Sequence, residues 1–544
     1  MADEYTGKEL VERYSQGMQA HRLWEPHWQS IADHLLPRKA TINTVRTRGE
    51  KAHKDRFSSA PMHYHEVLAA NLQGTLTSRS FRWFDLILSN NDELNKDPEM
   101  KGWLQDSSKR MWSAINQSNF HSHSHEFYID LTGFGTANIV VQAKSGPRRW
   151  NGLKFRTFPI QEYIFEEDED GQPNAVCMFY NWTARQIRSQ FPNATLSNSV
   201  TKAFKTDPNR KFMFLHWVIP RYENDPSKKD KMNMPFGSYW VDHQSQIIVE
   251  EGGFEEFPAM PTRWSRNSGE VYGRGPGSTA LADIKVLNKA TELSLDSWAK
   301  NLDPPWFVLD DGVVGKVDLR PGKGTVVRDR DALWFYESRG RPGVDQIKFE
   351  DLRNSIKMTF FADQLELPQS DRMTAEEIRT RVELMQRVLG PTLGRLETEY
   401  LNPLVMRIFN IMFRAGAFAE PPQIVIDAFN EGETELEVKY SGPLARAERL
   451  TEVFSIQRLY DSMAGPAQVD PSVMDIINND EAARVIAFNQ DVPESIIRTP
   501  EEIQAIRESR AEQQQMQQQM ELGLAQSQIA ESSAKVRSID AEIG

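Results

Sequence analysis

The run Thr374–Gly416 limits the possible folds of this chain more than any other stretch, because its pattern predicts one very long helix. Thr374 and Glu377 have the spacing of a capping box, and Gly416 stands where helices often end. Apolar residues recur between them at helical spacing, at Ile378, Val382, Met385, Leu389, Leu393, Leu396, Tyr400, Leu404, Ile408 and Ile411. A straight helix of this length would span roughly 60 Å. Pro391 and Pro403 predict kinks in it or a division into two or three shorter helices. Such a helix needs neighbours along its length, as in an elongated or oligomeric protein.

The composition is that of a soluble globular protein. The 544 residues are enough for three or four domains, with 39% hydrophobic and 26% charged residues. No apolar run has membrane-spanning length, and Met1–Gln16 is too polar for a signal peptide. Cys177 is the single cysteine, which excludes internal disulfides and cysteine-based zinc sites and indicates synthesis in a reducing, intracellular compartment.

The net charge of −13 restricts how the chain can meet nucleic acid. A protein that grips DNA tightly needs Lys and Arg to neutralise phosphates, and this chain as a whole repels DNA. Nucleic acid is therefore no partner, or it passes without sticking. No period of 20–50 residues repeats, which excludes solenoids and propellers.

The first half of the chain predicts an α+β fold with mainly helical content. Glu4–Leu36 has the pattern of a pair of amphipathic helices, and Tyr64–Thr77 and Pro98–Leu131 are also helical. From Ala137 to about Trp264 the pattern changes to strands, with a short capped helix at Thr183–Phe191.

Two clusters invite a metal hypothesis and are better explained otherwise. His121, His123 and His125 would share one face on a strand, but the flanking apolar spacing is helical, which favours ordinary surface histidines. The acidic run Glu166–Asp170 could indicate a calcium loop or paired catalytic carboxylates. It lacks the closing Glu of an EF-hand and lies between strand patterns, so a hairpin turn is favoured.

Neither glycine-rich motif predicts a nucleotide site. Gly273, Gly275 and Gly277 lack the flanking βαβ pattern, and Pro276 stands within the loop. We interpret them as a hinge before a helix capped at Ser278. The Gly-Lys-Gly-Thr at 322–325 lacks the leading glycine of a P-loop. We expect no catalytic residues, no metal and no cofactor.

The middle of the chain predicts a stalk with a head. A helix within Val271–Asn301 has Leu281, Ile284, Leu287, Thr291, Leu295 and Trp298 on one face and Asp283, Glu292 and Asp296 on the other. Asp303–Gly343 is a compact β-rich insertion, and Val344–Phe361 returns as a helix. A polar connector, Ala362–Met373, leads into the long helix.

The last part of the chain is less regular. Pro421–Ile426 and Leu436–Tyr440 predict short extended pieces, and Pro443–Ser462, Pro471–Ile477 and Glu481–Asn489 predict helices. Pro500–Ile543 is a Gln-rich, low-complexity segment, interpreted as a partly helical tail with a loose end.

In this order, five stretches resemble the head-to-tail connecting (portal) protein of T7-like short-tailed bacteriophages, the podoviruses. They read VYGRGPGSTALADIKVLNKATE, RMTAEEIRTRVELMQRVLG, SGPLARAER and VPESIIRTPEEIQAIRESRAEQQQ, with the β-rich tip after the first. Each motif is weak alone, but together they cover essentially the whole chain.

The resemblance implies a portal-type α+β fold in which each region has a place. Residues 1–274 would form the wing, 275–302 and 344–361 the two stem helices, and 303–343 the clip. Residues 362–373 would form a tunnel loop, 374–416 the spine helix, 417–500 the crown, and 501–544 a C-terminal helix, barrel or disordered tail.

It also implies site residues. In the tunnel loop, DNA would pass Gln364, Glu366, Gln369, Ser370 and Arg372. The stem would line the channel with Asp283, Glu292 and Asp296. The clip would bind partners through Trp306, Arg320, Lys323, Arg328, Arg330 and Trp334.

The implied function is a dodecameric ring at one capsid vertex that conducts double-stranded DNA during packaging and ejection. Implied partners are further copies of the chain, the terminase large subunit, tail adaptor and tail proteins, major capsid and scaffolding proteins, internal core proteins, and DNA without sequence specificity. No membrane partner is expected. The protein would be made in the host cytoplasm and reside in the virion.

Two other hypotheses remain. One is an intracellular oligomeric scaffold or adaptor with a coiled-coil tail. The other is a metal-dependent nuclease that uses Glu166–Asp170 and the histidine cluster; Asp168→Ala would abolish its activity.

Overall fold

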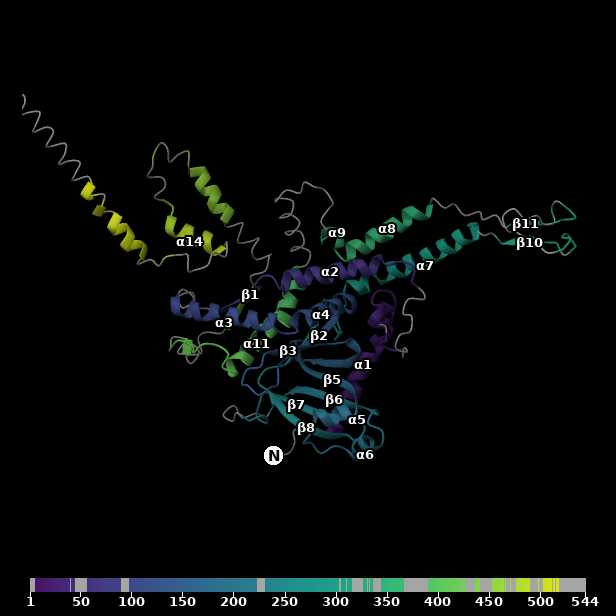
Figure 1. The fold of residues 1–544 in the computed structure, drawn as a ribbon, viewed down its shortest axis with the longest axis horizontal. Helices are drawn as coiled ribbons and strands as arrows, with labels where there is room; N and C mark the ends of the chain where they lie inside the picture. The colour runs from purple at the N-terminus through teal and green to yellow at the C-terminus, as the bar shows by residue number, and fades with distance from the viewer. Residues whose placement is uncertain are drawn as a thin grey trace, which may run out of the picture. The chain divides into compact units, whose positions relative to one another are not determined.

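The computed structural model describes residues 5–39, 41–44, 56–89, 97–222, 230–302, 305–309, 311–315, 326–329, 331, 333–335, 344–365, 390–423, 425–426, 436–440, 453–463, 465, 470, 476–489, 498, 502–510, 512–513 and 515–517. The chain divides into two compact units, Met1–Leu444 and Ala445–Gly544. Figure 1 shows the helices and strands of each. No helix within these ranges is long and apolar enough to cross a membrane.

A five-stranded antiparallel sheet forms one layer of the first unit. Its order is β4-β5-β6-β7-β8, a meander in which sequence neighbours pair. The strands are β4 (Tyr163–Glu167), β5 (Pro173–Thr183), β6 (Lys211–Pro220), β7 (Phe236–Asp242) and β8 (Ile247–Phe254). The predicted hairpin turn at the acidic run lies between β4 and β5 and is confirmed.

Helices cover both faces of this sheet, because alternate residues of a strand point to opposite sides. On β6, Leu215 and Trp217 pack against Leu10 of α1 (Gly7–His34), whereas Phe214 packs against α5 (Ala184–Gln190) and α6 (Asn198–Thr206). The predicted pair of helices at Glu4–Leu36 is wrong. The chain forms the single helix α1, which has a Thr6–Glu9 capping box and accommodates Pro26 internally.

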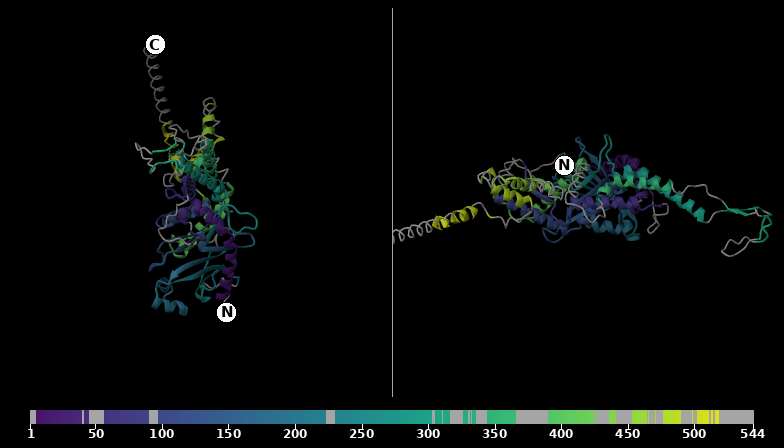
Figure 2. Two further views of the ribbon diagram at one scale, coloured as in Figure 1. Left: turned by 90° about the vertical axis from the view of Figure 1, so that its right-hand side faces the viewer. Right: turned by 90° about the horizontal axis from the view of Figure 1, so that it is seen from above.

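A second sheet connects the strands to the helices that surround them. Its order is β3-β2-β9, with β2 (Thr136–Ala143) between β3 (Leu153–Phe158) and β9 (Ala259–Arg263). Around it lie α2 (Ala60–Leu76), α3 (Pro98–Asn116) and α4 (Phe120–Phe134). The predicted helix at Pro98–Leu131 is therefore two helices, with a break at 117–119. A distant pairing, β1 (Phe84–Leu88) with β12 (Leu436–Tyr440), brings later sequence back to this region. Figure 2 shows the same body from two further directions.

Two helices form an antiparallel hairpin on this body. They are α7 (Pro276–Leu302) and α8 (Val344–Thr359), and β10 (Trp306–Val308) and β11 (Leu333–Phe335) lie between them in the chain (Figure 1). The predicted order of helix, β-rich tip and helix is therefore confirmed. The cap is not at Ser278, because α7 already begins at Pro276.

The described part of the predicted long helix, residues 390–416, is helical but changes type. Residues 390–396 are α-helical, Glu397–Leu401 form a π-helical turn, and α11 (Asn402–Arg414) follows. Pro403 occupies the first turn of α11, where its missing N–H is tolerated. Gly416 has a φ of +65° just beyond α11, as its predicted place at a helix end requires. Residues 374–389 lie outside the described ranges.

Two predictions near this helix need correction. The predicted connector Ala362–Met373 begins as a helical turn, α9 (Ala362–Leu365), with Ala362 fully buried. In the predicted extended piece Pro421–Ile426, positions 421 and 422 are not helical, whereas 423, 425 and 426 are helical. The remainder of that connector, 366–373, lies outside the described ranges.

Most described positions of the second unit are helical, with exceptions at 470, 477, 478 and 498. Residues 453–463 are helical and belong to the predicted helix Pro443–Ser462, which extends one residue further than predicted. The helix α14 (Asn479–Asn489) matches the predicted Glu481–Asn489. Residues 502–510 of the Gln-rich tail are also helical.

Candidate interaction surfaces of the helical hairpin

The base of the hairpin is fixed by close backbone packing at three glycines. A Cβ on Gly277 would overlap the carbonyl oxygen of Gly133 near the end of α4, and one on Gly275 would crowd Leu131. Opposite them, Gly135 has a φ of +87°, which favours glycine. The glycine-rich stretch predicted as a hinge therefore lets the first turn of α7 press against the end of α4.

Along its first half, α7 is buried in the core. Leu281, Ile284 and Leu287 are at most 9% exposed, as their shared helix face predicts, and they belong to the same core as Ile356 and Phe360 at the end of α8. Ser355 Oγ of α8 donates a 2.7 Å hydrogen bond to Asp283 Oδ2. These contacts fix how the two helices lie against each other.

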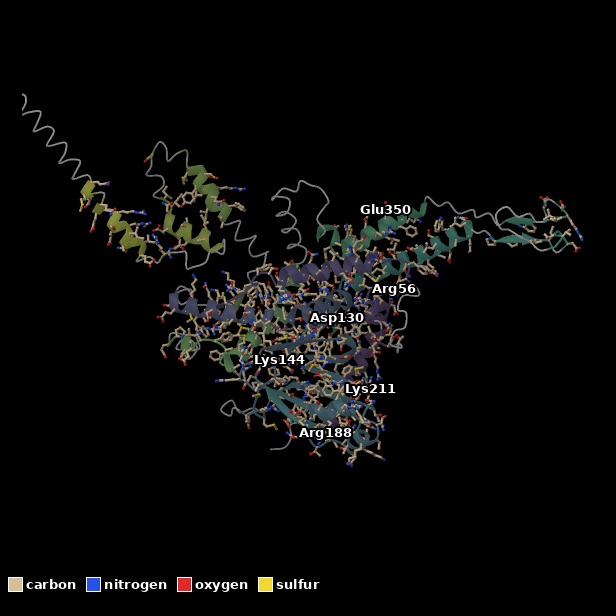
Figure 3. All side chains as sticks on the ribbon, viewed as in Figure 1. Arg56, Asp130, Lys144, Arg188, Lys211 and Glu350 are labelled. Carbon is tan, nitrogen blue, oxygen red and sulfur yellow. The ribbon has the colours of Figure 1, made fainter. Side chains whose placement is uncertain are left out.

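Along its second half, α7 exposes large apolar side chains. The exposed fractions are 57% for Leu293, 47% for Leu295, 63% for Trp298 and 68% for Leu302. Leu295 and Trp298 share a predicted face with buried Leu287, yet no described residue of the chain covers them. Figure 3 shows the side chains along both helices, with Glu350 marking α8. A face that is apolar for its whole length but buried for half of it is typical of an interaction surface.

The three predicted acidic stem residues do not share a face. Nine helical positions separate Asp283 from Glu292, a rotation of about 180° at 100° per residue. Asp283 points to Ser355 of α8, whereas Glu292 accepts from Lys289 Nζ at 2.9 Å. This ion pair raises the pKa of Lys289. Asp296 is exposed, and its charge also contributes to that rise.

The hairpin helices are also balanced in charge. Within α7, three acids are matched by three lysines, at 285, 289 and 300. Within α8, three acids are likewise matched by three basic residues. A lining formed by these helices would be of mixed charge and not purely acidic.

The tip carries an exposed aromatic pair. In the β10–β11 pairing Phe307 lies opposite Trp334, and their rings stack with centroids 5.7 Å apart. The two side chains, Phe307 and Trp334, are 46% and 48% exposed. Arg328 is also exposed, and its N–H donates to the Gly312 carbonyl at 2.8 Å.

Several predicted site residues have no side chain within the described part of the structure. Trp306 lies on β10 and Gln364 on α9, and only their backbone is described. The others lie outside the described ranges altogether: Glu366, Gln369, Ser370 and Arg372 in the predicted tunnel loop, and Arg320, Lys323 and Arg330 in the predicted clip.

The predicted helical placement of the histidine cluster is confirmed, and its members contact different partners. His121 Nε2 lies 2.7 Å from Asn116 Oδ1, while His123 Nδ1 accepts from the N–H of Thr157 at 3.2 Å. Within the described residues, no group of three potential ligands could hold a metal ion.

A buried ion-pair cluster that sequence reasoning missed fixes the π turn of the spine. Arg263 of β9 and Glu399 have side chains 1% and 3% exposed, and Arg263 Nη2 donates to Glu399 Oε1 at 2.6 Å. The backbone N–H of Arg263 donates to Glu399 Oε2 at 2.8 Å, and the guanidinium also bonds Glu167. The pairing joins positions 136 residues apart, so no local sequence pattern reveals it.

A second buried arginine fixes α11. Arg407 Nε donates to the Val141 carbonyl at 3.0 Å, and its Nη1 donates to the Glu256 carbonyl at 2.8 Å. Burial lowers the pKa of Arg407 to about 10, which leaves it charged at neutral pH. Together the two arginines connect the described part of the spine to the second sheet.

Comparison with known proteins gives this architecture a family. The chain is 28% identical to the probable portal protein of Bordetella phage BPP-1, over 99% of this chain and 97% of the relative. It is 26% identical to the portal protein of Salmonella phage epsilon15, over 98% and 96%. A chain from the solved virion of a native gene transfer agent aligns over 79% of this chain and 88% of its own length. Its identity of 11% and TM-score of 0.34 are too low to support an argument.

The model of the bacteriophage head to tail connecting protein family matches residues 7–497. The match includes the α/β body, the helical hairpin with its tip, the spine and most of the chain after the spine. The chain belongs to the bacteriophage head-to-tail connecting protein family.

Proposed function

We propose that the chain is one subunit of a viral portal, a dodecameric ring at a single capsid vertex through which double-stranded DNA enters and leaves. The observation that carries this proposal is the family match together with nearly full-length similarity to two phage proteins named as portals. The protein then acts as a structural conduit in the virion and not as an enzyme.

The exposed half of α7 supports assembly into a ring. Three large apolar side chains that share one face of α7, at 295, 298 and 302, are between 47% and 68% exposed in the single chain. Covering such side chains contributes roughly 1 kcal/mol or more each. In a closed ring every subunit offers the same surface to the next, so one apolar face is covered at every interface.

The charge pattern supports passage of DNA without tight binding. A chain with a net charge of −13 and charge-balanced hairpin helices neutralises few phosphates, so little counterion release holds the DNA. We propose that Gln364, Glu366, Gln369, Ser370 and Arg372 project toward the DNA, and that Glu292 and Asp296 face the channel. Asp283 accepts a hydrogen bond from Ser355 of α8, so we do not propose that it faces the channel.

The tip is the proposed docking site for successive partners. Stacked aromatic rings that remain exposed are typical anchors in protein interfaces, and exposed Arg328, which lies in the chain between the two tip strands, adds a planar charged donor. We propose that the terminase large subunit binds here during packaging and that tail proteins replace it afterwards. Trp306, Arg320, Lys323 and Arg330 would extend this surface. Capsid, scaffolding and internal core proteins would contact the wing and crown.

The assembly claim is testable with matched variants. Leu295→Ser with Trp298→Ser should reduce ring formation in mass photometry while leaving the circular dichroism of the single chain unchanged. Leu23→Ser on α1, where Leu23 is 83% exposed, is the control for removing an exposed apolar side chain elsewhere. Rings that form equally well in the double variant and wild type would refute the role of this face.

The nuclease alternative is tested separately. Incubation of the purified protein with DNA and Mg²⁺ or Mn²⁺ should leave the DNA intact. Cleavage that Asp168→Ala abolishes would establish the enzyme and remove the basis for a passive conduit. The scaffold alternative predicts that deletion of residues 500–544 abolishes assembly, whereas a ring held by α7 survives it.

A further inference from the structure

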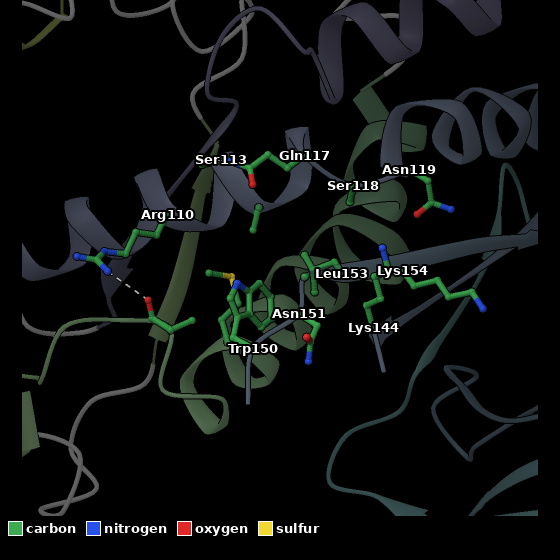
Figure 4. Close-up of a pocket in the computed structure, with 14 residues that line it drawn as sticks. Arg110, Ser113, Gln117, Ser118, Asn119, Lys144, Trp150, Asn151, Leu153 and Lys154 are labelled. Carbon is green, nitrogen blue, oxygen red and sulfur yellow. Dashed lines mark hydrogen bonds between the residues drawn. The ribbon is translucent and has the colours of Figure 1, made fainter. Parts of the chain in front are cut away.

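A cationic pocket lies in the α/β body, away from the hairpin. It has a volume of about 580 Å³ and is bounded by α3, the α3–α4 turn, the β2–β3 loop and the end of α11. Its size is within the usual range of small-molecule sites, roughly 300–1,000 Å³. Figure 4 shows Arg110 on one side, Lys144 and Lys154 on the other, and Trp150 between them.

The charge of the pocket is opposite to that of the chain. The protein has 77 acidic and 64 basic residues, yet the lining has three cations and no carboxylate. Arg110 Nε bonds Asp106 at 2.7 Å and its Nη1 donates to the Ala417 carbonyl at 3.3 Å, which leaves Nη2 for other contacts. Across the described residues, no hydrogen-bond or ion-pair partner is found for the ammonium of Lys144 or of Lys154. The two lysines lie at the opposite end of the pocket from Arg110, and together they favour an anion there.

The loop that carries these groups is held in place. The N–H of Lys144 donates to the Gly152 carbonyl at 2.8 Å, and Gly152 has a φ of +99° that suits glycine. Arg149 Nη2 donates to the Arg414 carbonyl at 2.9 Å, which fastens the loop to the end of α11. Binding an anion therefore requires little ordering of the loop, which reduces its entropic cost.

The aromatic and amide groups make the pocket more selective than a simple anion site. The half-buried indole of Trp150 offers a stacking surface for a planar ring, and base stacking on aromatic side chains is a common means of binding nucleotides. Gln117 adds an amide group that can both donate and accept, whereas the amide of Asn151 bonds the backbone of Arg148 within the loop. α4 also begins directly after Asn119, so its amino-terminal dipole lies beside the pocket and favours a phosphate.

From this geometry we infer that the pocket binds a nucleotide unit. The phosphate pairs with Lys144 and Lys154 at one end of the pocket, and the base stacks on Trp150 beside them. The unit is either a free nucleotide or one residue of a single strand, since both present a phosphate beside a planar base. The proposal does not depend on the portal assignment, because the pocket belongs to a single subunit.

Calorimetric titration of the full-length protein with dAMP, inorganic phosphate and a ten-residue oligodeoxynucleotide tests this. We expect dAMP to bind more tightly than inorganic phosphate. Lys144→Gln with Lys154→Gln should weaken binding at least about tenfold, because charge-assisted hydrogen bonds are lost. The control Lys202→Gln, at an exposed position on α6, should leave binding unchanged. Trp150→Leu should weaken dAMP but not phosphate.

The oligonucleotide distinguishes the two sources. Binding tighter than that of dAMP, with an affinity that falls steeply with salt, identifies a nucleic-acid strand. Equal binding identifies a free nucleotide. The proposal is overturned if neither dAMP nor the oligonucleotide binds at millimolar concentration, if the double lysine variant binds as wild type, or if an acidic peptide occupies the pocket and dAMP does not displace it.

Discussion

Replacing Arg263 with leucine should locally destabilise the spine helix at its π turn. The substitution removes a guanidinium that is 1% exposed and leaves the Glu399 carboxylate, 3% exposed, without its main partner. Breaking one side of a buried ion pair typically costs about 3–5 kcal/mol. Arg395 Nη1 remains 3.8 Å from Glu399 Oε1 and Arg266 still pairs with Glu167, so we expect the lower end of that range.

Hydrogen–deuterium exchange of the full-length protein measures this locally. A loss of about 3 kcal/mol accelerates exchange by roughly a hundredfold when opening is rapid and reversible. The faster exchange should be concentrated in the described spine, Glu397–Leu401 and α11. Arg266→Leu is the matched control, because that arginine bonds the same Glu167 from a site 33% exposed and should change exchange little.

A double variant separates charge from shape. Arg263→Leu with Glu399→Leu removes both charges, and replacing a buried pair by apolar residues is often nearly neutral. The spine helix of the double variant should therefore be better protected from hydrogen exchange than that of Arg263→Leu alone. Two results would refute the role of this ion pair. One is an Arg263→Leu variant whose spine helix exchanges hydrogen at the wild-type rate; the other is a double variant that loses as much protection from exchange as the single variant.

Three further predictions concern other parts of the first unit. Gly277→Ala should lower the thermal midpoint because its Cβ would overlap the carbonyl oxygen of Gly133, whereas Gly102→Ala, with open space around it in α3, should stabilise by up to about 1 kcal/mol. His216, whose pKa burial lowers to about 3, stays neutral in the folded state while the unfolded state takes up a proton near pH 6.5. Stability should therefore fall by about 1.4 kcal/mol per pH unit between 6.5 and 3 because of this residue, and denaturation at several pH values should show a shallower acid slope for His216→Gln. Trp334→Ser should weaken co-sedimentation of the terminase large subunit with rings that still assemble; undiminished binding would contradict the proposed docking site.

Local periodicity was enough to predict the elements to which we assign assembly and partner binding. α7 and α8 were predicted because apolar spacing and length are properties of the element itself, and the tip between them because its composition changes abruptly. Pro26 was misleading, since the surrounding packing of α1 outweighs the one backbone hydrogen bond that proline removes. Asp283 was grouped with Glu292 on one face by its polarity, although the nine positions between them already give a rotation of about 180° around a helix.

Contacts between distant residues could not be predicted in the same way. The pairing of Arg263 with Glu399, the β1–β12 strands, and the convergence of Arg110, Lys144 and Trp150 around one pocket all depend on the three-dimensional fold. Each of these residues has an unremarkable neighbourhood in sequence. A cationic pocket in an acidic chain cannot be inferred from net charge.

Imaging of the purified full-length protein by cryo-electron microscopy is the most direct test of the portal assignment. We predict closed rings with a central channel, in which Leu295 and Trp298 of each α7 are covered by the neighbouring subunit. Single chains that remain unassembled at high concentration and with scaffolding protein present would contradict this assignment, as would rings that leave these side chains in solvent.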